Sequence, residues 1–234
     1  MNKLEKKIEE IENRVRSEAE VMKVLPLDGH RKYLKKVCSH IKTEGLHCEF
    51  GVNRGSTISI ISSHIGDSTI YGFDSFEGLP EKWDDENPKG VYSLGGKIPP
   101  GPLNKAAQTD PGMYNTEMHA ALTGWPENVE LVQGMVEATV PKFLSEYKGN
   151  FAFAHLDLDI YSATRSVLQN IVSRVQSGTI LAFDELLDYP TYREHEIKAL
   201  AEMLLENEDI SYTPLIYQNN GYNYQQVTIK IGKE

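Results

Sequence analysis

Two apolar, strand-like runs in the second half of the chain each end in acidic residues. The first run is followed by Asp157 and Asp159, and the second by Asp184 and Glu185. Parallel strands end at a common edge of their sheet, so we expect the four acids to lie close together. Crowded ionised carboxylates repel one another unless a cation or a proton neutralises them, and all-oxygen ligands suit Mg²⁺, Ca²⁺ or Mn²⁺. The spacing therefore predicts a divalent-metal site.

A structural alternative is that these acids cap the helices that follow them, or pair with Arg165 or Lys198. One apolar residue separates Asp157 from Asp159, so the two side chains need not point the same way. His155 follows an apolar run, and we expect a buried supporting histidine there rather than a ligand. Nothing resembles a nucleophile elbow, and no serine or cysteine has an obvious base partner.

A glycine-containing loop follows an earlier strand-like run, residues 46–50. Gly51 and Gly55 stand before a helical pattern, where the backbone can approach a ligand and the helix N-terminus offers free N–H groups. The loop has neither GxGxxG spacing nor the Lys-Ser/Thr of a P-loop. Asp74 ends the next strand-like run, where an acid can bind both hydroxyls of a ribose. Together they favour an adenosine-containing cofactor, without separating NAD from S-adenosylmethionine.

The elements that must position these residues alternate along the chain. Strand-like and helix-like segments follow one another from residue 46, and the last two strand-like runs flank an Asn-Gly turn. This order predicts an α/β fold, a mostly parallel sheet with helices on both faces and a C-terminal antiparallel hairpin. The strands are expected at 46–50, 69–74, 129–132, 151–157, 179–184, 210–217 and 223–231, and the helices at 29–43, 57–64, 136–147, 163–176 and 191–207.

Two segments lie outside this alternation. Residues 1–44 form a predicted N-terminal helical extension, in which 3–23 carry an apolar stripe at helical spacing formed by Leu4, Ile8, Ile11 and Val15. Two interpretations of the stripe remain, a helix docked on the domain or a homodimer contact. The domain itself spans 45–234. Within it, about 81–120 is rich in glycine and proline, which is typical of a lid or binding insert.

Composition excludes several classes of protein. Apolar residues make up 40% and charged residues 25% of the 234, as in a globular chain with a sizeable core. The net charge of −10 gives no general reason to bind nucleic acid or an anionic membrane. No apolar run approaches the ~20 residues of a membrane span, and the charged start does not resemble a signal peptide. Cys38 and Cys48 form no metal-binding spacing, so we expect two reduced thiols in a cytoplasmic protein.

Four segments together resemble the macrocin O-methyltransferase family, whose members use S-adenosylmethionine and a metal to methylate sugar hydroxyls of antibiotics. The resemblance covers roughly residues 45–205. It implies a class I methyltransferase, with a Rossmann-like seven-stranded sheet. The segments are Gly51-Val52-Asn53-Arg54-Gly55-Ser56-Thr57, Tyr71-Gly72-Phe73-Asp74-Ser75-Phe76-Glu77-Gly78-Leu79-Pro80, His155-Leu156-Asp157-Leu158-Asp159-Ile160-Tyr161-Ser162 and Phe183-Asp184-Glu185.

The resemblance also implies roles for single residues. The cofactor would be bound by a loop and the next strand end: Gly51, Gly55 and Ser56 at its methionine part, Glu49 supporting the loop, Asp74 at the ribose, and Ser75 and Phe76 beside the adenosine. Mg²⁺ or another divalent cation would lie on Asp157, Asp184 and Glu185, and Asp159 would be the general base. Glu185 stands where many relatives carry Asp or Asn. The acceptor would be a small molecule with a hydroxyl, a sugar or glycoside.

Three other functions are considered. One is an NAD-dependent oxidoreductase of similar fold, although hydride transfer needs no four-acid cluster. Another is a non-catalytic methyltransferase-like partner subunit, which has no need of an intact acid set and cofactor loop. The third is a metal-dependent phosphatase, for which no phosphate cradle accompanies the acids.

Overall fold

We describe the protein from a computed structural model, in which residues 1–23, 29–102, 124–219 and 225–234 are described. Within those residues the chain forms one eight-stranded sheet in the order β1-β7-β8-β6-β5-β2-β3-β4. The strands are β1 (Glu20–Lys23), β2 (Leu46–Phe50), β3 (Ile70–Asp74), β4 (Val129–Gln133), β5 (Phe151–Leu156), β6 (Val175–Leu187), β7 (Ile210–Asn219) and β8 (Gln225–Lys233).

Neighbouring strands run parallel except at β8, which is antiparallel to both β6 and β7. The predicted α/β fold with a C-terminal antiparallel hairpin is therefore confirmed. Strands β2 to β8 are the seven that the sequence predicted. The Asn-Gly turn expected between the last two strands falls at residues 220–221, outside the described residues.

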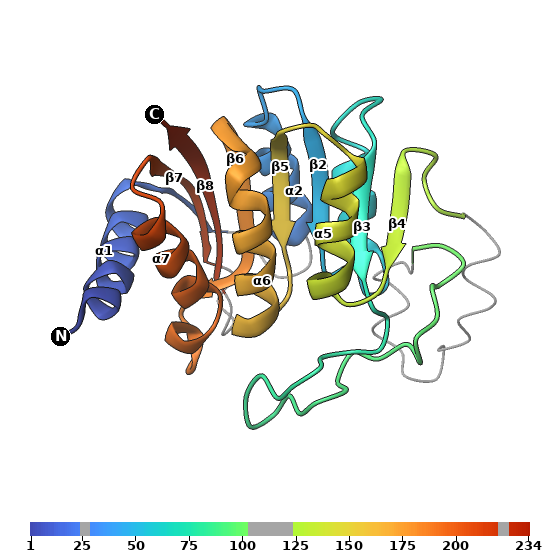
Figure 1. Cartoon of the computed structure of the whole chain (residues 1–234), viewed down its shortest axis with the longest axis horizontal. Helices are drawn as coiled ribbons and strands as arrows, with labels where there is room; N and C mark the ends of the chain where they lie inside the picture. The colour runs from blue at the N-terminus through green and yellow to red at the C-terminus, as the bar shows by residue number, and fades with distance from the viewer. Residues whose placement is uncertain (24–28, 103–123, 220–224) are drawn as a thin grey trace.

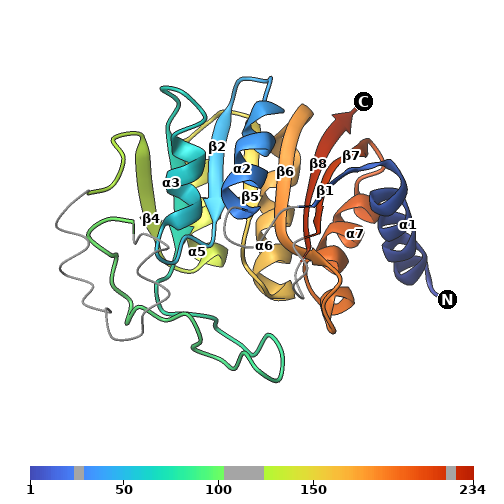
Figure 2. The same ribbon diagram turned by 180° about the vertical axis from the view of Figure 1, so that it is seen from behind.

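Helices cover both faces of the sheet. One face carries α5 (Val136–Glu146), α6 (Tyr161–Ile171) and α7 (Glu196–Glu206), as Figure 1 shows. The opposite face carries α2 (Gly29–Ser39) and α3 (Ser56–Ser62), seen in Figure 2. Short 3₁₀ turns lie at Val172–Arg174 and Tyr192–Glu194.

The central strands are apolar because helices cover them on both sides. All six residues of β5 are buried. The rings of Phe50 on β2 and Phe73 on β3 stack with centroids 4.9 Å apart, and Phe143 of α5 meets Phe73 edge-on at 5.1 Å. This packing fixes the relative positions of the strands whose ends carry the predicted site residues.

The eighth strand, β1, corrects the prediction of one helix over 3–23. Helix α1 (Lys3–Glu18) stops earlier, and Ala19 has an extended backbone that leads into β1. β1 then pairs in parallel with β7 and extends the sheet by one edge strand. The apolar stripe that predicted the helix ends at Val15, so the spacing did not require the helix to reach residue 23.

Helix α1 packs on the domain. Asn2 and Glu5 form a capping box, in which each side chain accepts a hydrogen bond from the other's backbone N–H. Ile8, Ile11 and Val15 are buried, and the helix contacts α7 and β7, beside which it lies in Figure 1. The chain's own domain therefore covers the apolar stripe, and the stripe gives no argument for a homodimer.

We expect Ile11→Ala to lower the free energy of unfolding by about 2–5 kcal/mol, because it removes a fully buried side chain and leaves a cavity. Urea unfolding followed by circular dichroism measures this change. Val21→Ala is the control, since Val21 is 47% exposed and its loss should cost less than about 0.5 kcal/mol. Equally small effects of the two substitutions would mean that α1 does not dock as described.

The predicted insert is described from residue 81 to 102, where it contains no helix or strand; residues 103–120 lie outside the described part. It lies beyond the carboxyl ends of β2 and β3 (Figure 1). Ser162, in the first turn of α6, donates a hydrogen bond to Glu81 at 2.7 Å. Trp83 packs edge-on against Tyr189, with ring centroids 5.6 Å apart. These contacts fasten the insert beside the strand ends.

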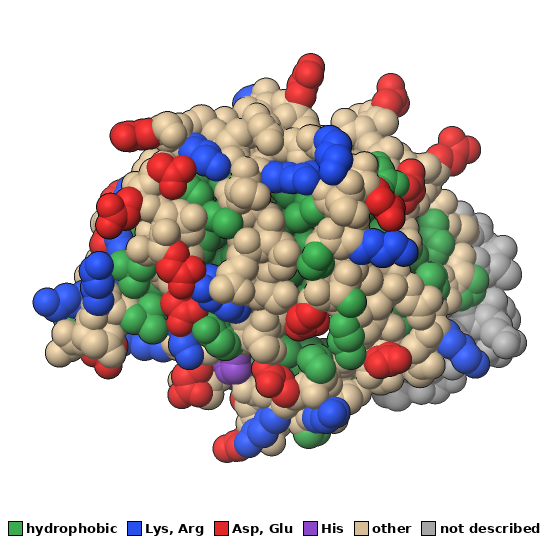
Figure 3. All heavy atoms as spheres, in the orientation of Figure 1, with side chains coloured by type: hydrophobic (Ala, Val, Ile, Leu, Met, Phe, Trp, Pro, Cys, Tyr) green, Lys and Arg blue, Asp and Glu red, His purple; other side chains and the backbone are tan. Residues whose placement is uncertain are grey.

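The surface seen in Figure 3 carries acidic and basic side chains interspersed, with apolar side chains showing between them in small groups. No helix among the described residues has the length and apolarity needed to span a membrane.

Candidate active site

A cavity of ≈ 530 Å³ opens at the carboxyl ends of β2, β3 and β5. Its walls come from the loop after β2, the end of β3, the segment after β4, the acids after β5 and the insert. The volume falls within the range of roughly 300–1,000 Å³ that is common for small-molecule sites. Ligands of open α/β sheets bind at this edge, so the cavity is the candidate site.

Three of the predicted acids converge at this edge. Asp157, Asp184 and Glu185 each offer a carboxylate oxygen, and these oxygens all lie within 4.8 Å of one another. Successive side chains in a regular strand point to opposite faces. The pairing of β6 with β8 shifts register between Phe183 and Leu187, which interrupts that alternation at Asp184 and Glu185. We attribute the convergence of two adjacent acids to this irregularity.

The electrostatics of the three acids fit a cation. Burial, followed by repulsion from Asp184, raises the pKa of both Asp157 and Glu185 well above the ordinary range. Glu185 Oε2 is buried without a hydrogen-bond partner. A divalent cation at this point would give Glu185 Oε2 a partner and would offset the repulsion among the three carboxylates. The donor set is all oxygen, which suits Mg²⁺, Ca²⁺ or Mn²⁺.

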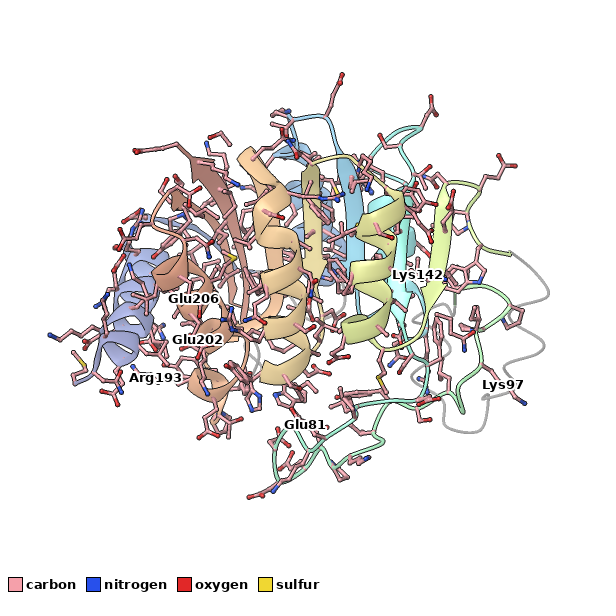
Figure 4. All side chains as sticks on the ribbon, viewed as in Figure 1. Glu81, Lys97, Lys142, Arg193, Glu202 and Glu206 are labelled. Atoms are coloured by element: carbon pink, nitrogen blue, oxygen red, sulfur yellow. The ribbon has the colours of Figure 1, made fainter. Side chains whose placement is uncertain are left out.

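Arg165 and Lys198, the two basic residues considered as partners of these acids, contact other groups. Arg165 pairs with Glu202 at 2.9 Å and with Glu206 at 2.6 Å, both on α7 and labelled in Figure 4. The ammonium of Lys198 lies 4.0 Å from the centre of the Tyr161 ring. Helix α6 also begins without a side-chain cap. The structure thus assigns neither cation to the three acids.

Asp159 lines the same cavity on a tight turn. Its φ is +62°, and the N–H of Ile160 bonds the carbonyl of Leu158 at 2.6 Å, which closes a γ-turn around Asp159. This turn brings the side chain into the cavity beside Asp157. Burial, with added repulsion from Asp184, Asp84 and Asp74, raises the pKa of Asp159 to about 7. A carboxyl group with that pKa accepts a proton readily near neutral pH.

His155 is buried between two carboxylates, as expected for a supporting residue. Its Nδ1 lies 3.4 Å from Glu49 Oε2 and its Nε2 lies 3.5 Å from Asp184 Oδ1. Burial opposes protonation of the ring, but Asp184 and Glu49 outweigh it and raise the pKa of His155 well above its ordinary value. Gln226 adds a close amide hydrogen bond to Asp184 Oδ1. His155 is not in the converging ligand set.

The glycine loop lies against the backbone of Asp157, directly after β5. Gly51 has a φ of +90°, and a Cβ atom there would lie 1.7 Å from the carbonyl oxygen of Asp157. Glu49 supports the loop from below, because its Oε1 accepts a hydrogen bond from the Thr57 hydroxyl at 2.7 Å. Gly51 and Ser56 line the cavity. Gly55 does not, since its α-carbon faces the Trp125 ring.

Asp74 borders the cavity and organises the loop. Its Oδ2 accepts hydrogen bonds from the N–H groups of Val52 and Asn53, at 2.8 and 2.6 Å, and its Oδ1 accepts one from Phe76 N–H at 2.6 Å. A carboxylate has about four acceptor sites, so roughly one remains for a ligand. Ser75 lines the cavity, whereas Phe76 is 1% exposed and lies in the core.

The sequence analysis gave no site role to individual residues in two parts of the wall, although it predicted the insert as a lid or binding segment. Gly134, Met135 and Val136 follow β4, and Trp83 and Tyr92 come from the insert. A glycine directly after a strand, as at Gly134, repeats the strand-to-helix signal of the first loop and could have identified the former group. The insert residues carried no periodicity or motif that indicated their position.

We expect Gly51→Ala to destabilise the fold and abolish cofactor binding, because its Cβ would displace the Asp157 backbone. Gly66→Ala is the matched control: φ there is +65°, and no atom lies within 4 Å of the added Cβ. The control measures only the free energy lost by placing alanine in a left-handed backbone conformation, about 1–2 kcal/mol. Thermal unfolding and calorimetric titration with S-adenosylhomocysteine measure both effects. Equal losses in the two variants would argue against close approach at Gly51.

Comparison with known proteins gives a family and a fold. A family profile described as "Methyltransferase domain" matches residues 48–186. The calicheamicin methyltransferase CalS11 is 19% identical, covering 97% of this chain and 91% of its own, with a TM-score of 0.58. The O-methyltransferase NovP is 17% identical, covering 88% and 80%, with a TM-score of 0.54.

A third structure, an O-methyltransferase from Bacillus cereus in complex with SAH, is 14% identical, covers 99% of this chain and 90% of its own, and has a TM-score of 0.52. At these identities the structures show a shared fold. None of the curated proteins compared matches this chain significantly.

Proposed function

The chain belongs to the methyltransferase-domain family, and from that premise we propose that it is an O-methyltransferase dependent on S-adenosylmethionine and a divalent cation. The observation that carries the proposal is the convergence of Asp157, Asp184 and Glu185 within 4.8 Å, beside a cavity bounded by the glycine loop. The family membership confirms the predicted enzyme class, a methyltransferase, over the oxidoreductase alternative.

The cofactor half of the proposed site is the glycine loop with the ends of β3 and β4. Gly51 and Ser56 would face the methionine part, with Glu49 holding the loop through Thr57. Asp74 keeps about one acceptor site for the ribose, and Ser75 lies beside it. Met135 would add an apolar contact to the adenosine. Gly55 and Phe76 would act indirectly, by shaping the loop and the turn after β3.

The metal half would hold Mg²⁺ on Asp157, Asp184 and Glu185. When bound, the cation would lower the pKa of a coordinated substrate hydroxyl, which otherwise lies far above neutral pH. Asp159 lines the cavity outside the ligand set and would take the hydroxyl proton at a carboxylate oxygen. Trp83 and Tyr92 of the insert would hold the acceptor and exclude water. Alignment of this kind can supply several kcal/mol toward methyl transfer.

The proposed acceptor is a hydroxyl of a sugar or of a glycosylated natural product. The macrocin-type segments support this choice, and so does the fold shared with CalS11, described as a TDP-rhamnose 3'-O-methyltransferase, at 22% identity and a TM-score of 0.52 over 86% of this chain and 77% of that one. Two neighbouring hydroxyls on a ring would suit chelation by one cation. Trp83 offers an aromatic wall against which a sugar ring can pack.

A methyl-transfer screen tests the proposal. The purified chain is incubated with labelled S-adenosylmethionine and a panel of nucleotide sugars and glycosides, with Mg²⁺ and after metal stripping with EDTA. We expect transfer to at least one vicinal diol, only with metal. Calorimetry with S-adenosylhomocysteine and NADH runs in parallel. Binding of NADH alone, or undiminished transfer after metal stripping, would overturn the proposal.

A further inference from the structure

A row of buried polar side chains crosses the sheet beneath the cavity. Glu49 on β2, His155 on β5 and Asp184 on β6 come from adjacent strands, and Glu49 and His155 are register partners. Their exposed fractions are 0%, 0% and 8%. Burial of a polar side chain lowers stability unless the group is hydrogen-bonded or paired with an opposite charge. The contacts within the row therefore decide how these side chains are oriented.

His155 is the middle of the row and faces a different carboxylate with each ring nitrogen. Nδ1 is 3.4 Å from Glu49 Oε2, and Nε2 is 3.5 Å from Asp184 Oδ1. Both separations exceed an ordinary N–H···O hydrogen bond and lie within ion-pair range. A small shift of the ring toward one carboxylate moves it away from the other, so the ring links the two positions.

The two ends of the row belong to different halves of the site. Glu49 Oε1 accepts the Thr57 hydroxyl in the first turn of α3, next to the loop that lines the cavity. Asp184 belongs to the converging acids, and Gln226 of β8 fixes its Oδ1 from the side opposite the cofactor loop. The row thus extends from the cofactor loop to the metal ligands through one hydrogen bond, at Thr57, and two contacts of ion-pair length, at His155.

We infer that His155 is a positioning residue for both halves, holding Glu49 and the cofactor loop through Nδ1 and orienting Asp184 toward the metal through Nε2. The inference rests on the proposed function, because it assigns the two halves to S-adenosylmethionine and a divalent cation. It gives His155 a role in ligand affinity without contact with either ligand.

Three substitutions of His155 distinguish the contribution of Nδ1 from that of Nε2. An asparagine amide nitrogen takes the place of Nδ1, a glutamine amide nitrogen takes the place of Nε2, and leucine offers neither. We expect His155→Leu to weaken both S-adenosylhomocysteine and Mn²⁺ binding, each by about 10- to 100-fold. His155→Asn should recover S-adenosylhomocysteine binding but not Mn²⁺ binding. His155→Gln should recover Mn²⁺ binding but not S-adenosylhomocysteine binding.

Calorimetric titration of the whole chain with each ligand gives the affinities, and thermal unfolding monitors folding. His47→Gln is the matched control, because His47 is a histidine on β2 that is also buried, at 7% exposed, with a backbone partner at Gly45. It should leave both affinities within about twofold, a change of under 0.5 kcal/mol. If His155→Leu does not fold, the Asn and Gln variants carry the comparison.

The outcomes separate this inference from the proposed function. A wild-type chain that binds neither ligand overturns both. If the wild-type chain binds both ligands, the positioning role is overturned by a His155→Leu variant that binds them equally well, or by Asn and Gln variants that lose both ligands in parallel. Either result leaves the proposed function standing. Opposite recoveries in the Asn and Gln variants support it.

Discussion

Asp157→Ala is expected to lose methyl transfer and its dependence on divalent metal together. Asp157 supplies one of three oxygens that lie within 4.8 Å, and the cation would be held by two acids without it. Metal activation of a hydroxyl contributes several kcal/mol, so the rate should fall by at least about 10³-fold. Initial rates measured against Mg²⁺ concentration test this. A variant that keeps a saturable Mg²⁺ dependence at wild-type concentrations would contradict the assignment.

The melting temperature of the Asp157→Ala variant tests whether its loss of activity comes from misfolding. An acid whose pKa is raised in the folded state destabilises that state at pH values above its unfolded pKa, because folding then holds an unfavourable charge. The raised pKa of Asp157 therefore predicts that the metal-free Ala variant melts no lower than the metal-free wild type near pH 8. Asp67→Asn is the activity control, because Asp67 is exposed and precedes β3, at the end of that strand opposite the cavity.

Asp159→Asn is expected to keep metal binding and to lose rate. Asp159 lines the cavity but does not belong to the three converging acids. Loss of a general base costs about 10²- to 10⁴-fold in kcat. Asparagine adopts a left-handed backbone about as readily as aspartate, so the γ-turn at φ +62° should persist.

The measurement is kcat at saturating Mg²⁺, with Mn²⁺ affinity determined by calorimetry on the same protein. Asp209→Asn is the matched control, since Asp209 is exposed and immediately precedes β7, at the sheet edge away from the cavity. Unchanged kcat would remove the base role from Asp159. Loss of Mn²⁺ binding would instead make Asp159 a ligand.

The fold followed from the sequence because its signals are local. Alternating apolar runs and helical patterns predicted strands β2 to β8 as a mostly parallel sheet with a C-terminal antiparallel hairpin. The continuous burial of β5 is what its apolar run implied. The extra strand β1 escaped prediction because four residues at a sheet edge carry no periodic signal. Their conformation depends on pairing with β7, which is distant in sequence.

The site was predicted by residue type, while its geometry was not. Spacing placed Asp157 and Asp184 at neighbouring strand ends. The γ-turn at Asp159 has no glycine or proline to signal it, and the register shift between Phe183 and Leu187 depends on pairing with β8, which is distant in sequence. Three assigned cofactor residues, Glu49, Gly55 and Phe76, do not line the cavity, and only Glu49 had been assigned a supporting role. The link through His155 depends on strand register, which an isolated sequence does not specify.

Mn²⁺ binding to the metal-stripped protein, followed by electron paramagnetic resonance, tests the metal site most directly because it needs no acceptor. The account predicts a saturable site in the wild type that Mg²⁺ displaces and that Asp157→Ala, Asp184→Asn and Glu185→Gln each weaken by at least about tenfold, or 1.4 kcal/mol. A wild-type protein without saturable binding, or variants that bind Mn²⁺ as tightly as the wild type, would contradict it.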